Sequence, residues 1–207
     1  MWKNCLNFWK MIIKKSNKSL NEAVSVLRQG GVVICPTDTV YGFLADGTNK
    51  KAVEKIFKIK KRPRSKSLPV FVRDFKMVKE LAEINDSQLK TLTLRDASGQ
   101  AKYWPGKYTF VFKIKKELKL YGQDKKTIAL RIPKYKFLNI LLKKINKPLV
   151  QTSANISGEV PLTKIKGIIE KFGGSDLQTL IIDGGDLKKS KPSQVFDLTQ
   201  VNLTRLR

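Results

Sequence analysis

One short segment constrains this sequence more than any other, because an apolar run is followed at once by a polar turn. Val32–Cys35 is continuously apolar, as is typical of a buried strand, and Pro36–Gly42 then brings two threonines, an aspartate and a tyrosine. Hydroxyl, carboxylate and phenol groups are therefore predicted at a strand end, where open α/β sheets bind ligands. The segment predicts an α/β protein with a small-molecule site at this point.

The rest of the sequence mixes predicted helices and strands without strict alternation. Ser19-x-x-Glu22 is a capping box that starts one helix, and Asn49 caps a second. Further helices are predicted at 75–94 (two short segments), 137–145 and 163–172, and further strands at 68–72, 109–114, 128–132, 148–150, 180–182 and 194–198. This order predicts the α/β fold class, with a twisted mixed β-sheet flanked by helices and not a doubly wound parallel sheet.

The sequence of 207 residues is long enough for one domain with a full core. No repeat and no linker rich in proline or glycine divides it, so residues 16–207 are predicted to form a single domain. Residues 1–15 mix aromatic residues with lysines and lack the apolar core of a signal peptide, so they are predicted to be a frayed N-terminal extension. No apolar run approaches the roughly 20 residues that span a bilayer, and no membrane partner is expected.

The charge of the chain is strongly positive, with 42 lysine and arginine residues against 17 aspartate and glutamate residues and a formal net charge of +25. Clustered cations bind nucleic-acid phosphates. Most of these cations are lysines spread over every segment, however, which is equally typical of a solvated surface. Anionic small substrates such as nucleotides fit the charge as well, so charge alone leaves these interpretations open.

The side chains that most often bind metals are scarce. Histidine is absent, which removes the commonest general base and the commonest zinc ligand. Cys5 and Cys35 lie far apart and form no CxxC pair, so neither a disulfide framework nor a thiolate metal site is expected. A reducing cytoplasm is therefore the expected location.

Four more polar clusters interrupt the pattern. In Lys58–Lys66, Pro63 stops a helix and presents Arg62 and Lys66 in a turn suited to grip a phosphate, although the same cations would also stabilise a helix C-terminus. Gln151–Gly158 places hydroxyls and an amide after a strand, either as a ligand site or as a helix cap. The remaining clusters are Trp104–Gly106 with Thr109, and Asp183–Gly185 with Lys191–Ser193.

Taken in order, these clusters resemble the YrdC-like family. The motifs that carry the resemblance are PTDTVYG, RPxxK, WPGxxT, ALRIP and TSANxSG, then DGG and PS before a strand, between about Leu20 and Arg207. The resemblance implies a YrdC/RibB-like α/β fold around a concave basic pocket, in the short single-domain form. Characterised members of the family are L-threonylcarbamoyladenylate synthases.

The resemblance also implies a reaction, partners and a cofactor. Family members combine L-threonine, bicarbonate and ATP into threonylcarbamoyl-AMP and pyrophosphate, with Mg²⁺ assisting. A downstream threonylcarbamoyl transferase complex then modifies an adenosine of tRNA. The sequence offers no cluster of carboxylates for a metal, so Mg²⁺ is expected on the ATP phosphates.

The resemblance assigns two groups of site residues. The family's contacts to L-threonine match Thr39, Arg131, Ser153 and Ser193, and its contacts to ATP match Arg62, Lys66, Thr127, Asn155, Thr163 and Arg207. These residue types fit the reaction, because nucleotidyl transfer needs positioning and charge neutralisation and no covalent protein nucleophile. A guanidinium such as that of Arg131 suits a substrate carboxylate, because the two groups form paired hydrogen bonds.

Some positions depart from the family's pattern. Lys107 and Tyr108 replace a frequent Pro-Leu, Tyr135 and Phe71 stand where histidines occur, and Gln194 replaces a threonine. These changes surround the predicted pocket and bear on specificity and rate.

Two other functions remain as alternatives. One is a non-catalytic module of the same fold that binds double-stranded RNA or tRNA through its basic face. The other is a carbamoyl-transferring maturation protein with another acceptor, which is disfavoured because such proteins carry zinc modules rich in cysteine and histidine.

Overall fold

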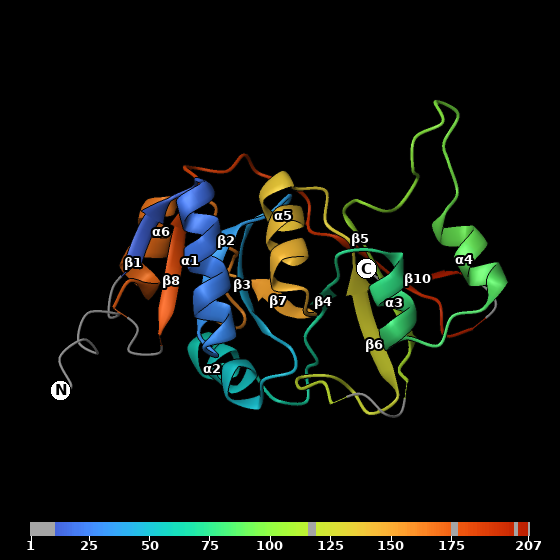
Figure 1. The fold of residues 1–207 in the computed structure, drawn as a ribbon, viewed down its shortest axis with the longest axis horizontal. Coiled ribbons are helices and arrows are strands. Elements are labelled where there is room, and N and C mark those ends of the chain that lie inside the picture. The colour runs from blue at the N-terminus through green and yellow to red at the C-terminus, as the bar shows by residue number, and fades with distance from the viewer. Residues whose placement is uncertain (1–10, 116–118, 175–177, 201–202, 207) are drawn as a thin grey trace.

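A computed structural model describes residues 11–115, 119–174, 178–200 and 203–206, and its strands form one mixed sheet (Figure 1). The order of the strands in the sheet is β1-β8-β2-β3-β7-β4-β6-β5-β9-β10. The sheet contains parallel pairs (β1 with β8, β8 with β2, β4 with β6, β5 with β9), and its other pairs are antiparallel. The predicted fold class, a mixed sheet flanked by helices, is confirmed.

The strands are β1 (Met11–Lys14), β2 (Val32–Pro36), β3 (Tyr41–Asp46), β4 (Val70–Phe71), β5 (Tyr108–Lys113), β6 (Thr127–Arg131), β7 (Leu149–Ser153), β8 (Thr179–Asp183), β9 (Gln194–Asp197) and β10 (Thr204–Arg205). The helices are α1 (Asn17–Arg28), α2 (Lys50–Lys60), α3 (Phe75–Leu81), α4 (Asp86–Leu92), α5 (Lys136–Ile145) and α6 (Ile165–Phe172). No helix in the described part of the chain is long and apolar enough to cross a membrane.

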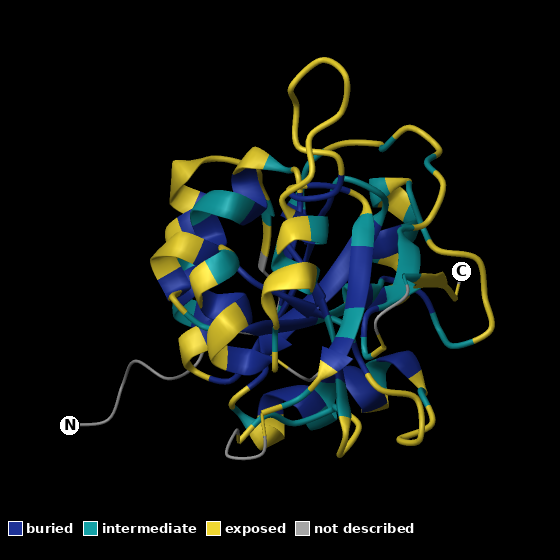
Figure 2. Cartoon of the chain, turned by 90° about the vertical axis from the view of Figure 1, so that its right-hand side faces the viewer, coloured by how far each residue is buried: buried dark blue, intermediate teal, exposed yellow. Residues whose placement is uncertain are grey.

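Strand β2 is buried on both faces because helices cover each side of the sheet. Val33 and Cys35 pack with residues of α1 and α5, whereas Val32 and Ile34 pack with residues of α2 and α6. Figure 2 shows the same layering, with strands buried and the outer faces of helices exposed. The side chains of a strand alternate between its two faces, so a continuous apolar run is what such a strand requires.

Several boundaries differ from the predicted ones. The N-cap of α1 is Ser16, which forms a capping box with Ser19, so the predicted box at Ser19 and Glu22 is wrong. Strands β3 and β10 lie where no strand was predicted. Strand β1 pairs with β8, so the sheet begins inside the stretch predicted as an extension, and residues 1–10 lie outside the described part.

Strand β4 joins two groups of strands although it is only two residues long. On one side lie β1, β8, β2, β3 and β7, and on the other lie β6, β5, β9 and β10. The polar clusters of the sequence are split between these groups: the β2–β3 loop and the residues after β7 belong to the first, and the ends of β5, β6 and β9 to the second. The site described next is lined from both sides of this junction.

Candidate functional site

A cavity of about 550 Å³ brings most of the predicted site residues together. Of the ten predicted residues, eight line it: Thr39, Arg62, Lys66, Arg131, Ser153, Asn155, Thr163 and Ser193. Its lining also includes Lys60 and Lys189, and none of the described lining residues is an aspartate or glutamate. A concave surface with this charge favours an anionic ligand.

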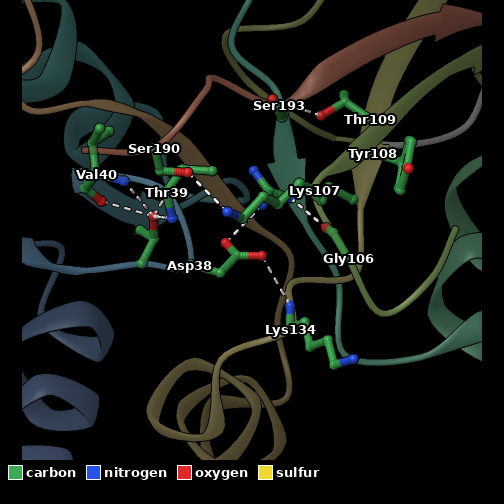
Figure 3. Close-up of polar contacts among 12 residues, drawn as sticks. Asp38, Thr39, Val40, Gly106, Lys107, Tyr108, Thr109, Lys134, Ser190 and Ser193 are labelled. Carbon is green, nitrogen blue, oxygen red and sulfur yellow. Dashed lines mark hydrogen bonds and ion pairs between the residues drawn. The ribbon is translucent and has the colours of Figure 1, made fainter. Parts of the chain in front are cut away.

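The polar turn of the sequence is the hairpin loop between β2 and β3, and its hydrogen bonds hold Thr39 in place. The Thr37 hydroxyl donates to the Val40 carbonyl (2.7 Å) and accepts the Thr39 N–H (3.0 Å). It also lies 3.0 Å from the Thr39 hydroxyl. Thr37 therefore acts as an internal brace of the loop, and Figure 3 shows Thr39 beside the Asp38 side chain.

Lys60 is the main feature of the cavity that the sequence reasoning missed. It is the last residue of α2, and only 3% of it is exposed. Its Nζ donates to the Ser153 carbonyl (2.8 Å), the Asn155 carbonyl (3.2 Å) and Asn155 Oδ1 (2.8 Å). Ser153 Oγ donates to the same Asn155 Oδ1 (2.7 Å), so the lysine holds both Ser153, the last residue of β7, and Asn155, which follows that strand.

The surroundings of Lys60 disfavour its positive charge. Burial, with a smaller contribution from the Arg62 guanidinium, lowers the pKa of Lys60 to about 8. The oxygens around its Nζ are neutral carbonyl, amide and hydroxyl groups. An anion placed in the cavity would supply the missing counter-charge, so this environment favours binding of a negatively charged group.

Arg62 is held over the turn that follows α2. The residue after the helix, Lys61, is its C-cap and has a left-handed backbone (φ 50°), and Pro63 prevents continuation of the helix, as predicted. Arg62 Nε donates to the Lys66 carbonyl (2.9 Å), and Nη2 donates to the Ser67 carbonyl (2.8 Å). Burial lowers the pKa of the Arg62 guanidinium. Arg62 and Lys66 thus both line the cavity from this hydrogen-bonded turn.

Arg131, at the end of β6, is 2% exposed and forms a short ion pair with Asp38 of the hairpin loop. Its Nη2 lies 2.6 Å from Asp38 Oδ1, and its Nε donates to the Gly106 carbonyl (2.9 Å). The Asp38 contacts are drawn in Figure 3. Three clusters that are far apart in sequence, PTDTVYG, WPG and ALRIP, therefore meet at this guanidinium.

The segment after β8 borders the cavity on another side. Tyr41 Oη donates to the Gly185 carbonyl (2.7 Å) and accepts the Gly184 N–H (3.0 Å), which ties the DGG motif to β3. Further along, Lys107 Nζ donates to Ser190 Oγ (2.8 Å), and Thr109 Oγ1 lies 3.4 Å from Ser193 Oγ. Lys107, one of the departures from the family's pattern, thus fastens this segment near the cavity.

Two predicted residues are not among the eight. Thr127 begins β6, whereas Arg131 ends it, so the two lie roughly 13 Å apart along the strand. Thr127 contacts Asp124 instead and does not line the cavity, so the prediction of a nucleotide contact there lacks support from this geometry. Arg207 lies outside the described residues.

Fold and cavity together define a class: an α/β protein whose mixed sheet carries a basic cavity rich in hydroxyl groups. The chain belongs to the Sua5/YciO/YrdC family, described as telomere recombination, which it matches over residues 25–207. This confirms the resemblance found in the sequence.

Solved structures place the chain beside particular members. A double variant of P. abyssi Sua5 superposes with a TM-score of 0.84 at 29% identity, covering 96% of this chain and 56% of that one. P. abyssi Sua5 complexed with L-threonine gives 0.81 at 28% identity, covering 95% and 56%. E. coli YciO gives 0.77 at 27% identity, covering 95% and 92%. The chain thus spans little more than half of the Sua5 chains but most of YciO.

Proposed function

We propose that the protein is an L-threonylcarbamoyladenylate synthase, which makes threonylcarbamoyl-AMP and pyrophosphate from L-threonine, bicarbonate and ATP for the threonylcarbamoyladenosine modification of tRNA. The observation that carries the proposal is one cavity that combines Lys60, Arg62 and Lys66 with Arg131 and several hydroxyls. Membership of the family and similarity to a Sua5 that binds L-threonine add support.

The residues that line the cavity suit two kinds of ligand. Lys60, Arg62, Lys66, Asn155 and Thr163 would bind the nucleotide, because cations and hydrogen-bond donors neutralise a triphosphate. Thr39, Arg131, Ser153 and Ser193 would bind L-threonine, with the guanidinium on the carboxylate. The amine would then attack carbon dioxide and lose a proton, or attack bicarbonate with loss of water, to form a carbamate. An oxygen of this carbamate would attack the α-phosphorus of ATP and expel pyrophosphate.

Magnesium enters this proposal as part of the ATP substrate. No three metal-binding side chains gather anywhere in the described part of the chain, and the described lining of the cavity lacks carboxylates. The phosphate oxygens of ATP would therefore coordinate Mg²⁺, which prefers oxygen ligands. The bound ion would reduce the negative charge of the triphosphate as pyrophosphate leaves.

The direct test is to incubate the pure protein with Mg²⁺-ATP, L-threonine and labelled bicarbonate. Mass spectrometry should detect a labelled threonine adenylate, and pyrophosphate should form only when both threonine and bicarbonate are present.

Replacing Arg62 by Ala should raise KM for ATP by roughly tenfold or more, because a charge-assisted contact to phosphate is lost. Arg28→Ala is a matched control, since Arg28 lies in α1 away from the cavity. Absence of threonine-dependent pyrophosphate from the wild type would overturn the proposal.

The net charge of +25 favours a second candidate, a non-catalytic module that binds double-stranded RNA or tRNA. The two candidates differ in what Arg62→Ala does. A binding module would keep its salt-dependent tRNA affinity in this variant and would form no adenylate, whereas the synthase would lose turnover. Filter binding to tRNA beside the pyrophosphate assay separates them.

A further inference from the structure

The Asp38–Arg131 contact differs from every other ion pair between described residues. It is the only one of these pairs in which both side chains are more than nine-tenths buried, with 2% of Arg131 and 7% of Asp38 exposed. Burying two charges is costly unless their geometry is good and their other hydrogen bonds are satisfied. A pair kept in this position, beside the cavity, therefore calls for a functional explanation.

The geometry of the pair is well satisfied on both sides. Asp38 Oδ1 accepts from Arg131 Nη2 (2.6 Å), and Asp38 Oδ2 accepts the Lys134 N–H (3.2 Å). Arg131 Nε donates to the Gly106 carbonyl (2.9 Å), and the Phe71 ring lies 5.5 Å from its Cζ. The contacts of Nη2 and Nε to two different groups fix the plane of the guanidinium.

The two partners face different spaces. Arg131 lines the cavity, whereas Asp38 lines an adjoining hollow together with Gly106, Lys107 and Lys134. Figure 3 shows Asp38 between Thr39 and Lys134. The Asp38 carboxylate is therefore not among the described groups that line the cavity, and its ion pair connects it to one that does, the Arg131 guanidinium.

We propose that Asp38 is a positioning residue for amino-acid binding: it holds the Arg131 guanidinium in the orientation that faces the substrate carboxylate. This inference rests on the proposed function, because that function assigns the carboxylate of L-threonine to Arg131. Without the counter-charge, a buried guanidinium would turn toward water or toward other acceptors. The cavity would then lose the paired hydrogen bonds that orient the amino acid, while the residues assigned to the nucleotide would keep their contacts.

The test replaces Asp38 by Asn, which keeps the size of the side chain and removes the charge. KM for L-threonine should rise by roughly tenfold, while KM for ATP stays unchanged. L-Threoninol, which lacks the carboxylate, should inhibit the variant as well as it inhibits the wild type, because it makes no use of the guanidinium. Asp74→Asn is the matched control: Asp74 pairs with Arg73, and neither residue lines the cavity. Its kinetics should equal those of the wild type.

A double-mutant cycle separates positioning from a merely structural role. Arg131→Lys should raise KM for threonine, and adding Asp38→Asn to it should change KM little further. Asp38→Glu, which keeps the charge but displaces it, should give an intermediate KM and covers the case that Asp38→Asn fails to fold. Equal losses for ATP and threonine, or additive effects of the two substitutions, would overturn the inference.

Calorimetric titration of L-threonine, without turnover, distinguishes failure of the inference from failure of the proposed function. Threonine binding that weakens in Asp38→Asn supports the positioning role even if no adenylate forms. Equal binding to Asp38→Asn and wild type, or no binding to the wild type, overturns it.

Discussion

At the scale of single residues, Lys60 should give the site a pH dependence. Its pKa in the free protein is lowered to about 8, so it is charged below that pH and becomes neutral above it. A bound triphosphate would favour the charged form, so affinity for ATP should fall as pH rises through about 8. Calorimetric titration with ATP on either side of this pH checks the prediction. Lys60→Arg should show no such fall, because guanidinium keeps its proton; a fall of the same size in that variant would contradict the assignment.

Folding stability should change in the opposite direction over part of this range. The pKa of Lys60 is about 8 in the folded protein and near the ordinary lysine value of 10.5 in the unfolded chain. Between these values the unfolded state binds more protons, so the contribution of Lys60 to the free energy of unfolding should increase with pH and should be lowest below about 8. Denaturant unfolding of the wild type and of Lys60→Met measures this contribution. The difference between the two proteins should depend on pH only in that window.

The contrast between Arg62 and Lys60 shows what residue-level reasoning can and cannot detect. Arg62 precedes a proline that ends a helix, so its place in a turn followed from the sequence. Lys60 lies close to other lysines in the sequence, and its residue type does not distinguish it from them. Its spacing from Ala52 and Ile56, four residues apart on the buried stripe of α2, was an available signal. Its partners after β7 lie 93 and 95 positions away and come from the tertiary fold alone.

At the scale of elements, the Tyr41 hydroxyl should hold the segment after β8 against β3. Its two partly buried hydrogen bonds reach Gly184 and Gly185, and a Cβ on Gly184 would come within 2.6 Å of the Pro36 ring. Tyr41→Phe removes the hydroxyl and leaves both backbone groups without this partner. The free energy of unfolding should drop by about 1–3 kcal/mol, measured by denaturant titration.

A matched tyrosine elsewhere provides the control for that prediction. The hydroxyl of Tyr135 accepts only an exposed contact from Lys15 among the hydrogen bonds found for it in the described chain. Tyr135→Phe should therefore change stability by less than about 0.5 kcal/mol. Hydrogen exchange of residues 184–193 should accelerate in Tyr41→Phe and not in Tyr135→Phe. Equal effects of the two substitutions would show that the Tyr41 hydroxyl does not anchor the segment.

Elements were predictable where local pattern and burial agree. The helices at 75–81 and 86–92 and the strands around 109 and 128 follow from apolar periodicity. Strand β3 was not predicted, because Gly42 and the polar turn before it indicate a loop. Its residues are nevertheless entirely buried, and the strand lies between β2 and β7. Strand β1 was not predicted, because its partner β8 lies far along the chain and the local sequence does not indicate that pairing.

At the scale of the whole molecule, the sequence motifs predicted the cavity better than the net charge did. Eight of ten predicted residues line one cavity because the hairpin loop, the turn after α2 and the ends of β6 and β7 converge at the β4 junction. Thr127 begins β6 and does not line the cavity, because motif spacing does not state which end of a strand faces a ligand. The surplus of lysines, spread along the chain, could not distinguish a nucleotide cavity from a polynucleotide surface.

The surplus of lysines should nevertheless affect the KM for ATP through the electrostatic field of the molecule. A molecule with a net charge of +25 attracts ATP, which is a polyanion, but exerts little force on L-threonine, a zwitterion. Raising ionic strength from about 0.01 M to about 1 M shortens the Debye length from about 30 Å to about 3 Å. KM for ATP should therefore rise steeply across this range in steady-state pyrophosphate assays, while KM for threonine changes little. Chloride and glutamate salts should act alike, because screening does not depend on the anion. A KM for ATP that is independent of salt would mean that only contacts inside the cavity, and not the surrounding lysines, bind the nucleotide.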